Sequence, residues 1–150
     1  MDEQTKKDYH AKVNDNIERY GYHMTFVDDS KASSFCYTTG IFKTCKIPEI
    51  FISALPQNLS FELIRKYVEL FNKSKDIPLN TKIDTLTERF SVYLIEVPYS
   101  RLHNYVLSTL RFYKNEEVKY LQLIFPDTRG LFPTEIGYDY DQEIIGALEM

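Results

Sequence analysis

The chain has 150 residues, of which 43% are hydrophobic and 27% are charged. This length fits one domain with one core, and the composition is that of a globular protein rather than of a disordered or membrane protein. The net charge of −4 argues against general attraction to phosphate backbones or anionic lipid, so nucleic acid is not the expected partner. No apolar run approaches the ~20 residues needed to span a bilayer, and a soluble, cytoplasmic protein is predicted.

Hydrophobic periodicity predicts three helices separated by groups of strands. In chain order, the sequence predicts a helix over 5–20, strands over 23–27, 35–42 and 49–55, a helix from Asn58 or Ser60 to 71, strands over 82–86 and 90–97, a helix from 100 to 113, and a strand over 118–125. The order mixes hairpins with helices. We therefore expect an α+β fold over 1–150, a single-domain sandwich with a mostly antiparallel sheet and two to three packed helices.

Within the first half, a polar turn over 28–34 predicts a β-hairpin between its flanking strands. Gly40 lies inside the second strand, where it indicates a bulge or a close backbone approach. The segment 49–55 is too apolar to alternate, which is typical of a central strand covered on both faces.

Residues 125–135 end the last strand with two prolines, a glycine and two phenylalanines. Asp127 stands where a β-turn prefers an aspartate, and Gly130 supplies the positive φ that such a turn needs. Beyond Arg129 there is no further basic residue, whereas five acidic residues follow. The sequence thus predicts a stiff loop followed by an anionic segment, in which Tyr138 and Tyr140 are candidate aromatic anchors for a partner.

Four short motifs carry a resemblance to a known family. They are YTTGI at 37–41, PEI at 48–50, LQLIFPD at 121–127 and GLFP at 130–133. Together they resemble the bacterial family called domain of unknown function 4262, from about residue 21 to residue 142. The late block is the specific part of the pattern. The resemblance implies a compact bacterial or phage-borne accessory domain, and it implies no activity.

The chain departs from the family pattern at three positions. Family members commonly have His before the P-E pair and Trp after the F-P pair, where this chain has Ile47 and Thr134. Phe125 also stands where Trp is usual.

Two groups of candidate site residues follow. The first is a functional loop made of Asp127, Arg129, Gly130, Phe132, Pro133 and Glu135. The second is a pocket made of Tyr37, Thr38 and Glu49. If the groups met at the ends of adjacent strands, Glu49 or Asp127 would be a candidate general base and Arg129 an anion ligand. The alternative is structural, with Asp127 closing a turn and Glu49 closing a strand end or pairing with Lys46.

Metal and cofactor sites are not predicted. His10, His23 and His103 lack the spacing of a metal motif. Cys36 and Cys45 are predicted as a buried thiol and a loop thiol.

The sequence leaves two classes of function open. The first is a protein-binding module, an immunity or regulatory factor that contacts a protein partner through the candidate loop and the acidic segment. The second is a small hydrolase with a carboxylate pocket at a strand end. The lack of a recognisable catalytic motif favours the first, so a non-enzymatic role is the leading prediction.

Overall fold

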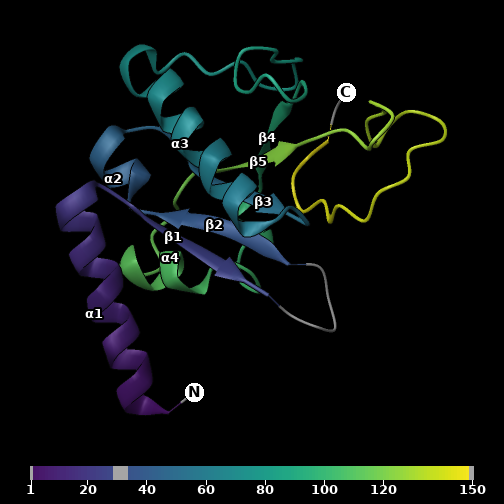
Figure 1. Ribbon diagram of the computed structural model, residues 1–150. Helices are drawn as coiled ribbons and strands as arrows, with labels where there is room; N and C mark the ends of the chain where they lie inside the picture. The colour runs from purple at the N-terminus through teal and green to yellow at the C-terminus, as the bar shows by residue number, and fades with distance from the viewer. Residues whose placement is uncertain (1, 29–33, 149–150) are drawn as a thin grey trace.

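The computed structural model describes residues 2–28 and 34–148. A five-stranded sheet runs through the middle of the protein, and helices lie on both of its faces (Figure 1). In spatial order the strands are β1 (His23–Val27), β2 (Phe35–Thr39), β3 (Glu49–Ser53), β5 (Tyr120–Ile124) and β4 (Tyr93–Val97). The helices are α1 (Glu3–Tyr20), α2 (Ile41–Cys45), α3 (Gln57–Ser74), α4 (Leu107–Phe112) and the short 3-10 helix η1 (Tyr99–Arg101). The predicted α+β class is confirmed.

The sheet is mixed and mostly antiparallel. β1 and β2 form the predicted hairpin, although residues 29–33 of its turn lie outside the described part of the chain. β2 pairs antiparallel with β3, and β4 pairs antiparallel with β5. β3 and β5 are parallel, with Glu49 opposite Tyr120. All five residues of β3 are buried, which confirms the predicted central strand.

The helix α3 covers one face of the sheet. Its apolar residues recur at helical spacing and are almost fully buried against the aliphatic side chains of β3, β4 and β5. On α3 these residues are Leu63, Ile64, Tyr67 and Phe71. This layer is the larger hydrophobic core.

The helices α1 and α4 share the opposite face (Figure 1). The helix α1 begins where the Asp2 carboxylate accepts the Thr5 N–H at 2.7 Å, and it ends at Gly21 with φ of +93°. Val13 and Ile17 are its buried residues, and the Tyr9 hydroxyl lies 2.8 Å from the Thr25 hydroxyl on β1. Both helices therefore cover the β1–β2 side of this face.

The C-terminal segment crosses the same face, and we call residues 139–147 the C-terminal strap. The carboxamide of Gln122 holds it at three points, donating to the Glu143 carbonyl and accepting the N–H groups of Ile145 and Gly146. The Ala147 N–H donates to the Glu96 carbonyl of the edge strand β4 at 2.8 Å. The strap thus covers one edge of the sheet and fixes the end of the loop before it.

Three predicted strands are wrong in extent. The strand predicted over 35–42 ends at Thr39, because residues 41 and 42 begin the helix α2. The strand predicted over 82–86 is reduced to a single bridge between Ile83 and Val92. The strand predicted from residue 90 begins at Tyr93.

The helix predicted over 100–113 is also wrong in part. The segment forms η1, then a turn, and only then α4. Leu102, Val106 and Leu110 are nevertheless buried, as the spacing predicts. The turn is held from outside the segment, since the Arg101 guanidinium donates to carbonyls of the strap and the Tyr105 hydroxyl donates to Glu143. Tertiary contacts thus override the local helical pattern.

Cys36 is buried as predicted, but Cys45 lies buried in α2 rather than in a loop. Among the helices of the described residues, none is long and apolar enough to cross a membrane.

Candidate functional site

Glu49, like Thr38, is fully enclosed by the protein. Its side chain is fully buried at the start of β3, and five donors converge on its carboxylate. The hydroxyls of Thr38 and Tyr113 donate at 2.8 and 2.5 Å. The backbone N–H groups of residues 40–42 donate at 2.9 to 3.1 Å. Glu49 therefore caps the first turn of α2, a task that the N–H groups at a helix start require from some acceptor.

Burial raises the pKa of the Glu49 carboxyl, and the hydrogen bonds from Tyr113, Thr38 and the backbone oppose this shift without cancelling it. A raised pKa often marks a general acid or base. Here, however, the carboxylate has no exposed surface and its oxygens are occupied by groups of the protein itself. The arrangement fits a structural clamp better than a catalytic group.

Tyr37 and Thr38 belong to the same buried region. The Tyr37 hydroxyl accepts the Ser108 N–H at 3.2 Å, and the Thr38 carbonyl accepts the hydroxyls of Thr109 and Tyr120 at 2.8 and 2.6 Å. Tyr37, Thr38 and Glu49 thus lie in one buried network that ties α4 to the sheet, and none of them lines an open pocket among the described residues.

Asp127 organises the candidate loop. Its Oδ1 accepts the N–H groups of Arg129 and Leu131, both at 2.9 Å, and its Oδ2 accepts the Asp139 N–H at 3.0 Å. The Gly130 N–H donates to the Asp127 carbonyl, and Gly130 has φ of +86°, so the predicted turn is confirmed. Burial acts to raise the pKa of Asp127, but the backbone donors outweigh it and the pKa is lowered.

The next residues are also tied to the fold. Phe132 is buried and packs edge-on against Tyr93, with ring centroids 4.8 Å apart. The Glu135 carboxylate accepts the Phe132 N–H at 3.0 Å, and Pro133 between them is half-buried. The Arg129 guanidinium donates to the Gly137 carbonyl. The loop is therefore closed by its own side chains.

The residue that follows Glu135 makes none of these contacts. Ile136 is fully exposed, with a side chain as open to solvent as in an extended peptide. Tyr138 and Tyr140, the predicted aromatic anchors, are used internally. The Tyr138 hydroxyl lies 2.7 Å from the Gln142 amide, and the Tyr140 hydroxyl donates to the Ala54 carbonyl. Sequence reasoning missed Ile136, because an isolated isoleucine in a loop carries no motif.

The pocket and the loop lie at opposite ends of the sheet. Glu49 pairs with Tyr120 at the start of β5, whereas Asp127 follows the end of that strand at Ile124. Seven residues of extended chain span roughly 20 Å. The two predicted groups therefore form two separate sites rather than one.

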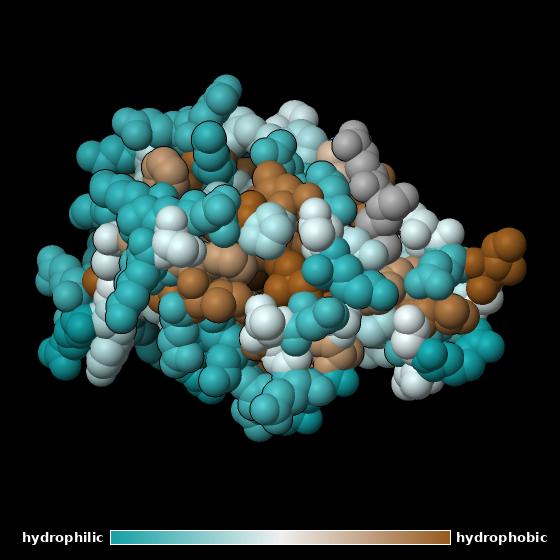
Figure 2. Space-filling view, turned by 90° about the horizontal axis from the view of Figure 1, so that it is seen from above, coloured by the Kyte–Doolittle hydropathy of each residue, from teal (hydrophilic) through white to brown (hydrophobic). Residues whose placement is uncertain are grey.

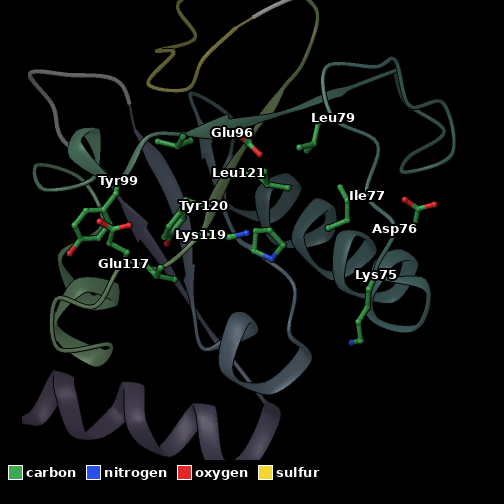
Figure 3. A pocket seen from close by; sticks show the side chains of 13 residues that line it. Lys75, Asp76, Ile77, Leu79, Glu96, Tyr99, Glu117, Lys119, Tyr120 and Leu121 are labelled. Carbon is green, nitrogen blue, oxygen red and sulfur yellow. The ribbon is translucent and has the colours of Figure 1, made fainter.

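A cleft of about 610 Å³ opens beside the start of β5, between this strand and the chain that follows α3 (Figure 3). Apolar side chains such as Ile77, Leu79 and Leu121 line it, and charged residues surround them. Lys119 points toward its middle, whereas Asp76 points away. The charged residues at the cleft are Lys75, Asp76, Glu96, Glu117 and Lys119. None of the predicted site residues lines it, although Pro48 and Leu121 of the family motifs do.

Within residues 2–28 and 34–148, no group of three His, Cys, Asp or Glu side chains is placed to hold a metal ion.

The fold and these contacts define a small α+β domain whose family motifs are largely structural. The sequence profile of the family described as Domain of unknown function (DUF4262) matches residues 16–139. The match covers most of the chain, so this protein belongs to that family, and the resemblance seen in the sequence is confirmed. No curated protein and no solved structure matches the chain.

Proposed function

We propose that this protein is a protein-binding module, an immunity or regulatory factor, that contacts its partner through residues 127–141. The observation that carries the proposal is the full exposure of Ile136 on a loop whose backbone is fixed by Asp127 and Arg129. A large apolar side chain held in water by a stiff loop is already positioned for contact. Binding through it therefore costs little conformational entropy.

Charge defines the kind of partner. Residues 130–148 contain no lysine or arginine, and the exposed acidic residues Glu135, Asp139 and Asp141 flank Ile136 in sequence. A complementary partner has an apolar pocket with basic residues around it. In Figure 2, hydrophobic side chains reach the outline of the molecule on the side to which the C-terminal segment projects in Figure 1.

The hydrolase alternative gains no support from the carboxylates on which it depends. Glu49 is fully buried beneath five donors, and both oxygens of Asp127 accept backbone N–H groups. A general base needs a free lone pair facing its substrate. We therefore do not assign either group to chemistry.

The test is site-specific photo-crosslinking in the native host. A photoreactive phenylalanine analogue replaces Ile136, and a matched variant carries it at Leu107, another apolar residue that is 64% exposed. We expect a protein crosslinked from position 136 and not from position 107. Once purified, this crosslinked protein should bind the Ile136→Asp variant about 30-fold more weakly than it binds the wild type, because a central apolar contact is worth ~2 kcal/mol.

The unfolding free energy of Ile136→Asp should equal that of the wild type, since the side chain contacts solvent. A crosslinked protein that binds Ile136→Asp with unchanged affinity would overturn the proposal, as would identical crosslinks from both positions. Asp127→Ala is a poor probe for this purpose, because it removes three hydrogen bonds that shape the loop.

A further inference from the structure

A second cleft lies between α1 and α4, and we call it the α1/α4 cleft. It has a volume of about 370 Å³, and the buried side chain of Val13 lines its apolar part together with the ring of Phe112. The proposed protein contact is formed by the C-terminal segment, which projects on the other side of the molecule in Figure 1. The polar residues of the cleft are His10, Asn14, Ser108, Arg111 and Lys114.

These polar residues share one property, which is that all of them can donate hydrogen bonds. Arg111 and Lys114 are cations, His10 carries at least one ring N–H, and no carboxylate lines the cleft. The protein as a whole has 22 acidic residues against 18 lysines and arginines. A cleft without a single acid is therefore a local reversal of the charge of the protein.

The bases in the cleft are also crowded. The Arg111 guanidinium contacts the imidazole of His10, although both groups are basic. The charged groups that face His10 are Lys6 on its own helix and Arg111 on α4, with Lys114 across the cleft. Lys43 extends the positive region, because its amino group lies 5.4 Å from the centre of the Phe112 ring.

No carboxylate in the described part of the chain forms an ion pair with Arg111 or Lys114. Within the described residues, the ion pairs are Arg19 with Asp15, Lys66 with Glu69 and Arg89 with Glu62, and Arg111 is in none of them. Burial lowers the pKa of His10, and the charges of Arg111 and Lys6 lower it further. Repulsion among the bases thus disfavours the imidazolium until an anion binds nearby.

We propose that the α1/α4 cleft binds a small phosphate-type oxyanion, such as a phosphomonoester or a pyrophosphate group. The Arg111 guanidinium forms a two-pronged contact with two oxygens, Lys114 adds a point charge, and Asn14 and Ser108 donate to the remaining oxygens. Phe112 and Val13 bound the cleft on its apolar side. The volume fits one or two phosphate groups rather than a polymer.

The test is an NMR titration with inorganic phosphate and with pyrophosphate, each at constant ionic strength set with sodium chloride. We expect amide shifts confined to the cleft residues. We also expect the pKa of His10, followed at the ring C–H, to rise on saturation, because a bound anion stabilises the imidazolium. Arg111→Gln should weaken pyrophosphate binding at least tenfold and abolish the rise.

Arg19→Gln is the control, since Arg19 lies on α1, the helix that carries His10, but pairs with Asp15. Arg19→Gln should leave both the affinity for pyrophosphate and the rise in the pKa of His10 unchanged. His10→Gln, checked for its unfolding free energy, tests the site if Arg111→Gln is poorly folded, and it should also weaken binding.

Shifts spread over all surface lysines and arginines, with equal affinity in Arg111→Gln, would mean an adventitious ion only and would overturn the proposal. A short DNA duplex that binds this cleft more tightly than pyrophosphate, with a steep salt dependence, would indicate a phosphodiester backbone as ligand. That result would also overturn the assignment to a small oxyanion.

Discussion

At the scale of single residues, Glu49 shows how a conspicuous carboxylate serves structure. The sequence offers it as either a general base or the closure of a strand end, and the contacts favour closure. Its oxygens accept from Thr38 and Tyr113 and from three consecutive backbone N–H groups. Leaving such donors unpaired in a buried site costs free energy, so the acid at this position is tied to the turn above it.

Glu49→Gln is expected to lower the unfolding free energy by about 1–3 kcal/mol at pH 5, because the amide brings donors to a place already filled with donors. The exposed variant Glu116→Gln should change it little. Chemical denaturation of both variants and the wild type measures the difference.

The contribution of Glu49 to the free energy of unfolding depends on pH with a definite sign. The pKa of Glu49 lies above its usual value of 4.5 in the folded protein, so the folded state holds this proton more tightly than the unfolded chain does. The stability it contributes is full below pH 4.5 and is lost as the pH rises through the folded pKa. Glu49→Gln lacks this slope, and its deficit should shrink as the pH increases. A deficit that grows with pH would mean that the carboxylate is stabilised instead.

At the scale of elements, α2 explains why the strand β2 ends at Thr39, before the alternating pattern does. Alternation over 35–42 predicts a strand, but Gly40 turns the chain at φ of +109° and residues 41 and 42 enter the helix. The cause is Glu49, nine residues further along, whose carboxylate accepts their N–H groups. A local pattern carries no information about that contact. Of the bulge and the close backbone approach that Gly40 indicates, the structure shows the close approach.

Gly40→Ala is expected to destabilise the protein by about 3 kcal/mol or more. A left-handed backbone with a side chain costs ~1–3 kcal/mol, and the added Cβ would also lie 2.9 Å from Ile17 Cγ1 and 3.1 Å from the Gly21 carbonyl oxygen. Gly130→Ala is the control for backbone strain alone, because φ there is +86° and nothing lies within 4 Å of the new Cβ.

Thermal and denaturant unfolding of the two variants separates strain from collision. Gly130→Ala should cost about 1 kcal/mol. Equal losses in both variants would show that α1 gives way freely at Ile17, contrary to the tight packing seen between α1 and Gly40.

At the scale of the whole molecule, the class of fold follows from the sequence but the strand order does not. Periodicity identifies which residues are buried, and Leu102, Val106 and Leu110 are buried even where the helix was wrongly placed. The parallel pairing of β3 with β5 is set by how the layers close, which no single segment encodes. The separation of Glu49 from Asp127 follows from that pairing, so the sequence could not predict it either.

The C-terminal strap is the other feature that segment patterns miss, because it is neither helix nor strand. It is held by polar side chains, above all Gln122, whose carboxamide makes three hydrogen bonds to the strap backbone. The sequence shows this stretch as an anionic surface. In the structure Ile145 is buried in the core, and the Glu143 carboxylate accepts the Tyr105 hydroxyl.

Gln122→Ala is expected to release the strap rather than to leave its backbone groups buried and unpaired, each of which would cost ~1–3 kcal/mol. Amide exchange at Ile145, Gly146 and Ala147 should accelerate strongly, and proteases should cut first within 139–147. Gln57→Ala, at an exposed position in the first turn of α3, should leave both unchanged. The Asp139 N–H of the strap donates to the Asp127 carboxylate. A released strap should therefore also loosen the loop that presents Ile136. Slow exchange at Ile145 to Ala147 in Gln122→Ala would contradict this view, and would mean that Ile145 and Arg101 hold the strap without Gln122.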